Sequence, residues 1–376
     1  MTPIFRFAST ENHPMRGPRQ HSPSISYRYF TESARSRCRH GFSIAWPYRP
    51  SRIGRSALHP VGNARRMGKD NYPNTGRLRH MPIQTYALHP GFAAEASYRD
   101  LSERLDDTVI AAIGAALKTY PVLVFRDQHL TDAQLRDFAL RFGPLEIGRP
   151  AARPGRRRLA IPQIGDVSNL DEDGKVRALT DKRRLDSLGN RLWHTDASYM
   201  PVPVVFGFLH AVTLPPPSPF GNGETEFADM RAAYDALPQA TRDAIDPLVA
   251  EHDIFWSRAQ IGFTDFEPGD REKYPPSPQR LVRRHPVTGR KNLYLSAHAS
   301  HIVGWPVADG RLLLLDLTSH ATQPGFVYSH DWRVGDLLIW DNRCTMHRGR
   351  PHDEMQPRDL RRATMLDTAS TLDEAA

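Results

Sequence analysis

A histidine and an aspartate, His194 and Asp196, stand two positions apart in the stretch "RLWHTDASY", residues 191–199. The stretch has the pattern of a half-buried strand, in which alternate side chains point the same way, so both groups would reach one point in space. An imidazole and a carboxylate that converge can bind a metal ion. With 17 His and 42 acidic residues among 376, His-x-acid occurs roughly twice by chance. A hydrogen-bonded core pair is therefore the alternative.

A third candidate ligand, His347, follows the apolar strand-like run at residues 337–340. Two histidines and one carboxylate, with open positions opposite for a cosubstrate and O2, are the ligand set of non-haem Fe(II) oxygenases. Arg358 and Arg362 come eleven and fifteen residues after this histidine. Because they are four apart at the strand-like "RRATML", both can point inward, each with a planar guanidinium that matches a carboxylate.

The elements that must position these residues alternate between helix and strand patterns. In the first half, the expected elements are a helix over 105–120, a strand over 121–127 and a helix over 130–144. Thr131 is the cap candidate of the second helix, which Gly143 and Pro144 should end. Residues 150–190 are rich in Arg, Pro, Gly and Asp, which predicts a long mobile loop of the kind that often forms a lid.

Strand-like runs dominate the second half of the chain. The runs cover 203–214, 292–300 and 336–340, with helical stretches at 230–238 and 310–322 between them. Mostly antiparallel strands with a few flanking helices indicate a mainly β fold with a jelly-roll core rather than a doubly wound sheet. The sequence has no Gly-rich phosphate loop and no H-E-x-x-H zinc motif, so nucleotide binding and zinc proteolysis are disfavoured.

The net charge of +8 is unevenly distributed. Residues 1–80 hold 15 Lys+Arg and 3 Asp+Glu, which leaves 35 against 39, or −4, for residues 81–376. We expect the basic leader 1–80 to be disordered, because its composition cannot bury enough apolar surface. It is either a transit peptide or upstream sequence translated from a start codon placed too early, with the true start at Met81. The acidic body does not indicate nucleic-acid binding.

The cysteine content and the hydropathy predict a soluble, cytoplasmic protein. Cys38 and Cys344 offer neither a disulfide framework nor a thiolate zinc cluster. The sequence contains no run of about 18 apolar residues that could span a membrane. A homo-oligomer is compatible with the sequence, which does not fix the oligomeric state.

At these motifs the sequence resembles the taurine and phenoxyacetate dioxygenase family, whose members use Fe(II) and 2-oxoglutarate. The likeness runs from about residue 87 to residue 367. The sequence is similar to the 2,4-dichlorophenoxyacetate dioxygenase branch in four stretches, "NRLWHTDASY", "GETEFADMRAAYDALP", "AHASHIVGWPVADGR" and "WDNRCTMHRGR". The resemblance implies a double-stranded β-helix core in residues 81–376, with Fe(II) as cofactor and 2-oxoglutarate and O2 as cosubstrates.

The resemblance also implies roles for individual residues. His194, Asp196 and His347 would be the iron ligands. Thr225 and Arg358 would hold the distal carboxylate of 2-oxoglutarate. Arg362 would contact the cosubstrate or an anionic substrate. The stretch "LPPPSPFGNGETEF" is a few residues longer than the family's usual spacing, so a displaced threonine is the alternative.

Several nearby residues have two interpretations each. His298 could line the substrate site or be a structural histidine, and Asn190 could contact substrate or cosubstrate or be a turn residue. Trp193 and Trp340 could shield the site or simply pack in the core.

Two arginines and a cysteine near His347 also have structural interpretations. The alternative for Arg358 is a surface ion pair with Asp359 or Glu354. Arg361 is expected to be a solvated charge, and Cys344 a small buried apolar group.

The sequence thus predicts a dioxygenase that hydroxylates a small anionic substrate, an aryloxyalkanoate with ether cleavage above all. The first alternative is the same chemistry on an organosulfonate such as taurine. The second is a non-catalytic jelly-roll binding protein. The third is a nucleic-acid binder that uses the basic leader.

Overall fold

The structure is a computed structural model that describes residues 83–98, 100–147, 157–219 and 221–373. The described residues belong to one unit of the chain, Pro73–Ala376. The leader 1–80 lies outside them, as does part of the loop expected at 150–190. Every helix in the described ranges is too short or too polar to cross a bilayer.

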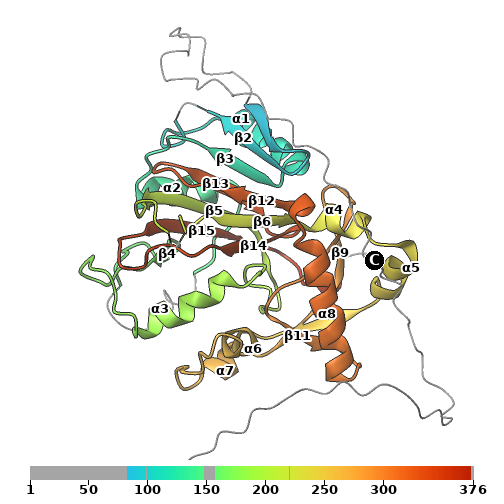
Figure 1. The fold of residues 1–376 in the computed structure, drawn as a ribbon. Helices are drawn as coiled ribbons and strands as arrows, with labels where there is room; N and C mark the ends of the chain where they lie inside the picture. The colour runs from blue at the N-terminus through green and yellow to red at the C-terminus, as the bar shows by residue number, and fades with distance from the viewer. Residues whose placement is uncertain (1–82, 99, 148–156, 220, 374–376) are drawn as a thin grey trace, which may run out of the picture. The chain divides into compact units, whose positions relative to one another are not determined.

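A seven-stranded sheet brings the first and last strands of the described chain together. Its strand order is β1-β2-β3-β13-β5-β15-β4, and β2 and β3 are its one parallel pair within the described residues. In Figure 1 the blue strands from the start of the chain lie in one sheet with the red strands from its end. The strands are β1 (Gln84–His89), β2 (Ala93–Ser97), β3 (Val122–Phe125), β4 (Gly165–Ser168), β5 (Val204–Thr213), β13 (Leu337–Asp341) and β15 (Asp359–Leu366).

A three-stranded antiparallel sheet packs against one face of the large sheet. Its order is β12-β6-β14, with β6 (Thr225–Asp229), β12 (Val327–His330) and β14 (Thr345–Gly349). The core between the sheets includes Phe227 and Trp340, whose ring centroids are 5.7 Å apart. Two sheets that share one core form the expected jelly roll, and the predicted fold class is confirmed.

Alternation along β13 explains how one strand serves two cores. Leu338 and Trp340 point into the core between the sheets, whereas Leu337 and Ile339 belong to the hydrophobic cluster on the opposite face. The helices α1 (Asp107–Thr119) and α2 (Asp132–Leu140) cover that opposite face. The expected cap is present, because the Thr131 hydroxyl accepts from the backbone N–H of Gln134.

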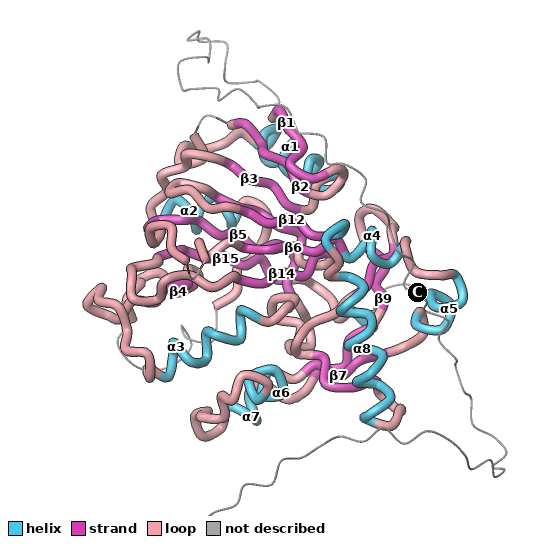
Figure 2. Tube along the Cα trace, viewed as in Figure 1, coloured by secondary structure: helices cyan, strands magenta, loops and turns pink. Residues whose placement is uncertain are grey.

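The chain between β6 and β12 forms a second region with its own hydrophobic cluster (Figure 2). Short antiparallel sheets, β11-β7-β8 and β10-β9, lie in this region. Its elements are α4 (Met230–Asp235), α5 (Gln239–Ile245), β7 (Val249–His252), α6 (Ile254–Ala259), α7 (Asp270–Lys273), β8 (Ser277–Arg280), β9 (Val282–Arg284), β10 (Lys291–Leu293), β11 (Ala299–Ile302), α8 (Val307–Ala321) and η5 (Pro324–Phe326).

Three sequence expectations differ from the structure. Residues 292–300 are not one strand, because β10 and β11 are separated by a turn. The loop expected at 150–190 contains β4, α3 (Lys182–Ser187) and most of η4 (Leu188–Arg191). Residues 191–199 are not a strand either, and their local structure is described with the site below.

Candidate active site

Backbone pairing brings His194 and His347 side by side. The two residues form an isolated antiparallel bridge, with N···O distances of 2.9 Å and 2.8 Å. Their ring centroids are 4.3 Å apart. The Nδ1 of His194 lies 2.8 Å from the Leu192 carbonyl, so this nitrogen carries the proton and Nε2 is left with a lone pair.

Asp196 completes a group of three possible ligands. One carboxylate oxygen lies 3.7 Å from the Nε2 of His194, and the other lies 3.7 Å from the Nε2 of His347. The three ligand atoms all lie within 4.8 Å of one another, and all three residues are buried. The Oδ2 of Asp196 has no hydrogen-bond partner among the described residues. A buried carboxylate oxygen in that position is costly unless a cation binds it, so these residues fit a divalent metal.

The segment that carries His194 and Asp196 is a bridge followed by a turn, so the expected strand is wrong. Asn342, in the β13–β14 connection, accepts from the backbone N–H of Asp196 at 3.0 Å and donates to its carbonyl at 3.0 Å. The next residue, Ala197, has a φ of 51°, and the chain turns away there. The Asn342 side chain thus makes the two backbone hydrogen bonds that a neighbouring strand would make in a sheet.

Burial and nearby charges set the protonation states of the three ligands. Burial would raise the pKa of Asp196, but Arg362, His347 and His194 hold it at about 2. Burial lowers the pKa of His347 to about 3, and it also lowers the pKa of His194. At neutral pH the site therefore offers one carboxylate and two neutral imidazoles, which are the forms that bind a metal.

Arg358 is half-buried, and it has no carboxylate partner among the described residues. Its Nη2 donates to the Gly223 carbonyl at 3.1 Å, and its Nε has no partner. Burial lowers its pKa to about 10, so it remains charged at neutral pH. Glu354 is instead paired with Arg184, at 2.7 Å, and with Arg191. An unpaired cation with a buried Nε fits an anionic ligand better than the alternative of a surface ion pair.

Thr225 is the first residue of β6 and lies near this arginine. Its hydroxyl accepts from the Trp332 indole N–H at 3.0 Å. Gly223, two residues earlier, is the residue whose carbonyl accepts from Arg358. The long stretch before β6 is folded into a turn in which the Ser218 hydroxyl donates to the Gly221 carbonyl. Thr225 and Arg358 therefore lie at the same end of the small sheet.

The two arginines that follow in β15 have different partners. Arg362 donates to a carboxylate oxygen of Asp196 at 3.0 Å, so it belongs to the site. Arg361 is only 12% exposed and pairs with Asp132, at 2.9 Å, and with Asp359. The expectation that Arg361 is a solvated charge is wrong, because β15 lies inside the large sheet and α2 covers this position.

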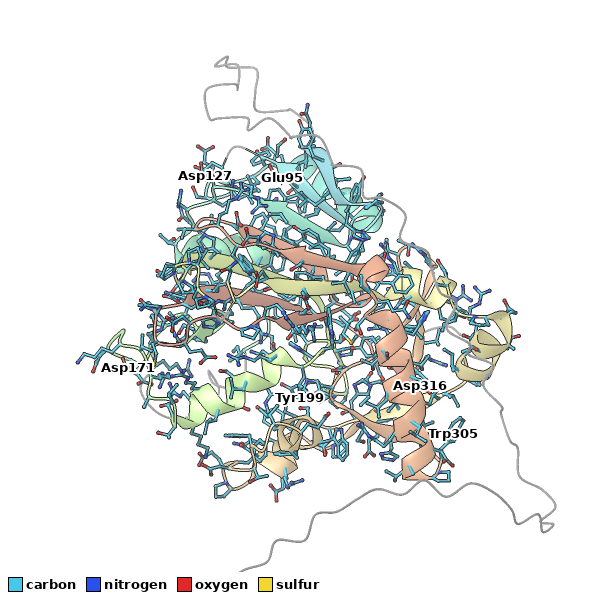
Figure 3. The ribbon with its side chains drawn as sticks, viewed as in Figure 1. Glu95, Asp127, Asp171, Tyr199, Trp305 and Asp316 are labelled. Atoms are coloured by element: carbon cyan, nitrogen blue, oxygen red, sulfur yellow. The ribbon has the colours of Figure 1, made fainter. Side chains whose placement is uncertain are left out.

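His298 and Asn190 come from different elements near the ligand group. His298 is buried, with its Nδ1 2.8 Å from the Ser257 hydroxyl. Its ring is 6.5 Å from His194 and 5.0 Å from Tyr199, which Figure 3 labels. Asn190 is half-buried in η4, which contacts β14.

The two tryptophans near the ligands differ in their packing. Trp340 is buried in the core between the sheets, with its ring 5.1 Å from His347. Trp193 is partly buried against the second hydrophobic cluster, and the guanidinium of Arg348 lies 4.6 Å from its ring. Trp340 therefore serves both core packing and the wall beside His347.

A second group of possible ligands, His285, Asp341 and Cys344, is explained by hydrogen bonds. Asp341 accepts from Arg343 through both carboxylate oxygens and lies 2.9 Å from the Nε2 of His285. The other nitrogen of His285 accepts from backbone N–H groups. Cys344 is buried, as expected, and burial raises the pKa of its thiol well above the ordinary value. The three donors are thus satisfied or protonated, and a metal has no free ligand there.

Sequence reasoning missed the residues that act through the backbone of the site. Asn342 binds both backbone groups of Asp196, and the Asn169 side chain accepts from the backbone N–H of Arg358 at 2.9 Å. Trp332 binds Thr225 from a neighbouring loop. A contact between an amide side chain and a distant backbone leaves no spacing pattern, so the sequence carried no signal for Asn342 or Asn169.

Comparison with known proteins assigns the chain to a family. A sequence profile described as "Taurine catabolism dioxygenase TauD, TfdA family" matches residues 84–364. The chain is 45% identical over 291 residues to the alpha-ketoglutarate-dependent 2,4-dichlorophenoxyacetate dioxygenase of Cupriavidus pinatubonensis, covering 77% of this chain and 99% of that one. It is 38% identical to the (S)-phenoxypropionate/alpha-ketoglutarate-dioxygenase of Sphingobium herbicidovorans, covering 68% and 85%.

Solved structures agree with this assignment. The crystal structure of AAD-2 in complex with Mn(II) and N-oxalylglycine superposes with a TM-score of 0.74 at 46% identity, covering 77% of this chain and all of that one. The jelly-roll core, the buried His-Asp-His group and these matches lead to one conclusion: the chain belongs to the TauD/TfdA family of alpha-ketoglutarate-dependent dioxygenases.

Proposed function

We propose that this chain is an Fe(II)- and 2-oxoglutarate-dependent dioxygenase that hydroxylates a small anionic substrate, specifically an aryloxyalkanoate. The proposal is carried by one observation, that a carboxylate oxygen and a guanidinium nitrogen are each buried without a hydrogen-bond partner among the described residues. Asp196 has an unpartnered carboxylate oxygen between two neutral imidazoles, and Arg358 has an unpartnered Nε. The first group fits a divalent cation, and the second fits a carboxylate.

In this proposal each side chain has a defined role. His194, Asp196 and His347 hold the iron, which supplies the activation of O2. Thr225 and Arg358 hold the distal carboxylate of 2-oxoglutarate.

The protein's own contribution is positioning and charge neutralisation. Arg362, 3.0 Å from Asp196, adds positive charge where a cosubstrate or an anionic substrate binds. His298 and Asn190 would contact the substrate.

The overall reaction converts the substrate, O2 and 2-oxoglutarate to the hydroxylated product, succinate and CO2. If the attacked carbon carries an ether oxygen, the product is a hemiacetal, which breaks into a phenol and an oxo acid. The relatives named for 2,4-dichlorophenoxyacetate and (S)-phenoxypropionate support this substrate class. Arg358, whose buried Nε has no partner, favours an anion of either carboxylate or sulfonate type.

An anaerobic titration tests the proposal most directly. Fe(II) and 2-oxoglutarate are added to the chain, and we expect a metal-to-ligand charge-transfer band in the visible spectrum that shifts when the substrate is added. His194→Ala, Asp196→Ala and His347→Ala should each abolish the band and the turnover, because each removes one of three ligands. Full activity in any of these variants would remove that residue from the iron site.

Product analysis separates the alternatives. A panel of aryloxyalkanoates and organosulfonates, which includes taurine, should give succinate coupled to loss of the aryloxyalkanoate. The sulfonate alternative draws on the family's own description and on a relative named as an alpha-ketoglutarate-dependent sulfate ester dioxygenase. Binding without any Fe(II)-dependent succinate release would instead identify a non-catalytic jelly-roll protein.

A further inference from the structure

The hydroxyl proton of Thr225 has no hydrogen-bond acceptor among the described residues. A threonine hydroxyl has one proton to donate and two lone pairs to accept with. Its oxygen accepts from the Trp332 indole N–H at 3.0 Å, and the described residues offer the proton no acceptor. Both side chains are buried, at 5% and 7% exposure. A buried donor without an acceptor is unfavourable, so the hydroxyl proton is available to a ligand.

We propose that Trp332 is a positioning residue for the cosubstrate, because its indole N–H orients the Thr225 hydroxyl so that the hydroxyl donates to a carboxylate of 2-oxoglutarate. This inference rests on the proposed function. The indole can only donate, so it occupies a lone pair of the hydroxyl and never competes for its proton. A hydroxyl that accepts one hydrogen bond is also polarised into a better donor for the next.

The acceptor that we assign lies beside Arg358. Gly223, two residues before Thr225, accepts from the Nη2 of Arg358 at 3.1 Å. A Cβ added to Gly223 would lie 3.1 Å from the unpartnered Nε of that arginine. The guanidinium and the hydroxyl therefore lie at one end of β6, where a single carboxylate can accept from both.

The indole itself is held in place by a buried network behind it. His330, opposite Thr225 in the β12–β6 ladder, packs edge-on against Trp332 with ring centroids 4.6 Å apart. The Nε2 of His330 lies 3.0 Å from the Asp336 carboxylate, which also accepts from Arg126 at 2.6 Å. This network fixes the direction of the indole N–H. The N–H in turn determines which lone pair of the Thr225 hydroxyl is used as the acceptor.

Three variants test the inference through a double-mutant cycle. Trp332→Phe removes the N–H and keeps a ring, and Thr225→Val removes the hydroxyl with little change in shape. The dissociation constant of 2-oxoglutarate is measured from the charge-transfer band of the anaerobic Fe(II) protein. We expect it to rise about tenfold in Thr225→Val and about threefold to tenfold in Trp332→Phe. The double variant should match Thr225→Val, because Trp332 acts only through the hydroxyl.

Controls separate positioning from loss of structure. Trp305→Phe, at a 36% exposed position before α8 (Figure 3), should leave the dissociation constant unchanged. Mn(II) binding in the absence of 2-oxoglutarate should be the same in Trp332→Phe and in the unmodified protein. Thr225→Ser keeps the hydroxyl and should bind 2-oxoglutarate as the unmodified protein does.

The outcomes that overturn the inference are distinct from failure of the proposed function. If the unmodified protein gives no charge-transfer band, the proposed function fails and this inference fails with it. If the band is normal and Trp332→Phe binds 2-oxoglutarate unchanged, only the inference fails. It also fails if Trp332→Phe weakens 2-oxoglutarate binding by the same factor in the Thr225→Val background as in the unmodified protein.

A second measurement does not depend on the folding of Trp332→Phe. In the NMR spectrum of the Zn(II)-loaded protein, the indole N–H cross-peak of Trp332 is identified as the one that Thr225→Val displaces. The same cross-peak should shift when 2-oxoglutarate binds to the unmodified protein. A cross-peak that does not move with 2-oxoglutarate would overturn the inference.

Discussion

Two half-buried arginines four residues apart, Arg358 and Arg362, have opposite electrostatic environments. Asp196 raises the pKa of Arg362 and accepts a hydrogen bond from it. Burial lowers the pKa of Arg358 to about 10, and no described carboxylate pairs with it. Arg362 therefore already has one carboxylate partner, whereas Arg358 has none among the described residues and is left for a ligand.

Arg358→Ala should raise the dissociation constant of 2-oxoglutarate about tenfold to a hundredfold, since a buried charge-assisted hydrogen bond is lost. The measurement is the charge-transfer titration. Arg361→Ala is the matched control, because this arginine pairs with Asp132 and Asp359 and contacts none of the proposed site residues. Equal weakening by the two variants would remove Arg358 from cosubstrate binding.

At the level of single residues, the sequence identified the groups that lie together but not how they are held. His194, Asp196 and His347 were candidates through their types and the family resemblance, and the structure brings them within 4.8 Å. Their convergence comes from a bridge and from Asn342, not from strand alternation. Such support is invisible in one sequence, because any of the chain's amides could face any backbone.

Among the elements, the connection between β13 and β14 has the largest effect on the site. It carries Asn342, whose amide binds both backbone groups of Asp196. It also leads directly into β14, which carries His347. One short turn therefore fixes two of the three proposed ligands relative to each other.

Asn342→Ala should weaken Mn(II) binding about tenfold or more, in line with the loss of a group that orients a metal ligand. Asn292→Ala is the matched control, because Asn292 is also buried and donates to the Arg343 carbonyl in the same turn but does not touch Asp196. Both variants should lower stability, and only the first should weaken Mn(II) binding in an EPR titration. Equal metal affinities would show that Asn342 is purely structural.

The sequence predicted the long elements better than the short ones. The helices expected over 105–120 and 310–322 are present as α1 and α8, because their apolar spacing extends over three or more turns. The apolar run at 292–300 gave a wrong single strand. Leu293, at the end of β10, and Leu295, before the turn at residues 297–298, are both buried in the second cluster, so their apolar character reflects packing rather than a ladder.

At the scale of the whole molecule, several buried histidines are held neutral, which links folding to pH. Burial lowers the pKa of His252 to about 3 and that of His352 to about 4. Below pH 6.5 the unfolded chain takes up protons that these folded side chains do not. The free energy of unfolding should therefore fall as the pH drops from about 6.5 towards 3, and it should not depend on these groups at higher pH.

Urea denaturation of the metal-free chain between pH 7.5 and pH 5 measures this dependence. Each such histidine contributes at most about 1.4 kcal/mol per pH unit. His252→Gln should reduce the slope of the free energy of unfolding against pH, whereas His129→Gln, at an exposed position, should not. A slope that is the same in both variants would contradict the assignment of His252 as a neutral buried group.

We propose that residues 81–376 carry the whole dioxygenase domain. The family profile begins at residue 84, and the match to the Cupriavidus enzyme covers 99% of that protein with 77% of this chain. A chain that begins at Met81 should retain the charge-transfer band and the turnover of the full chain, within about twofold. A nucleic-acid function of the leader predicts instead a salt-sensitive DNA affinity that disappears in the shortened chain.

The burial of Cys344 has a practical consequence for kinetic experiments. A shortened chain from Met81 contains this cysteine alone, in the connection that also carries Asn342. A thiol reagent needs the thiolate and physical access, so labelling of Cys344 requires the connection between β13 and β14 to open. Timed mass spectrometry of that labelling would measure the rate of this opening, and a metal that ties His347 to Asp196 should lower the rate.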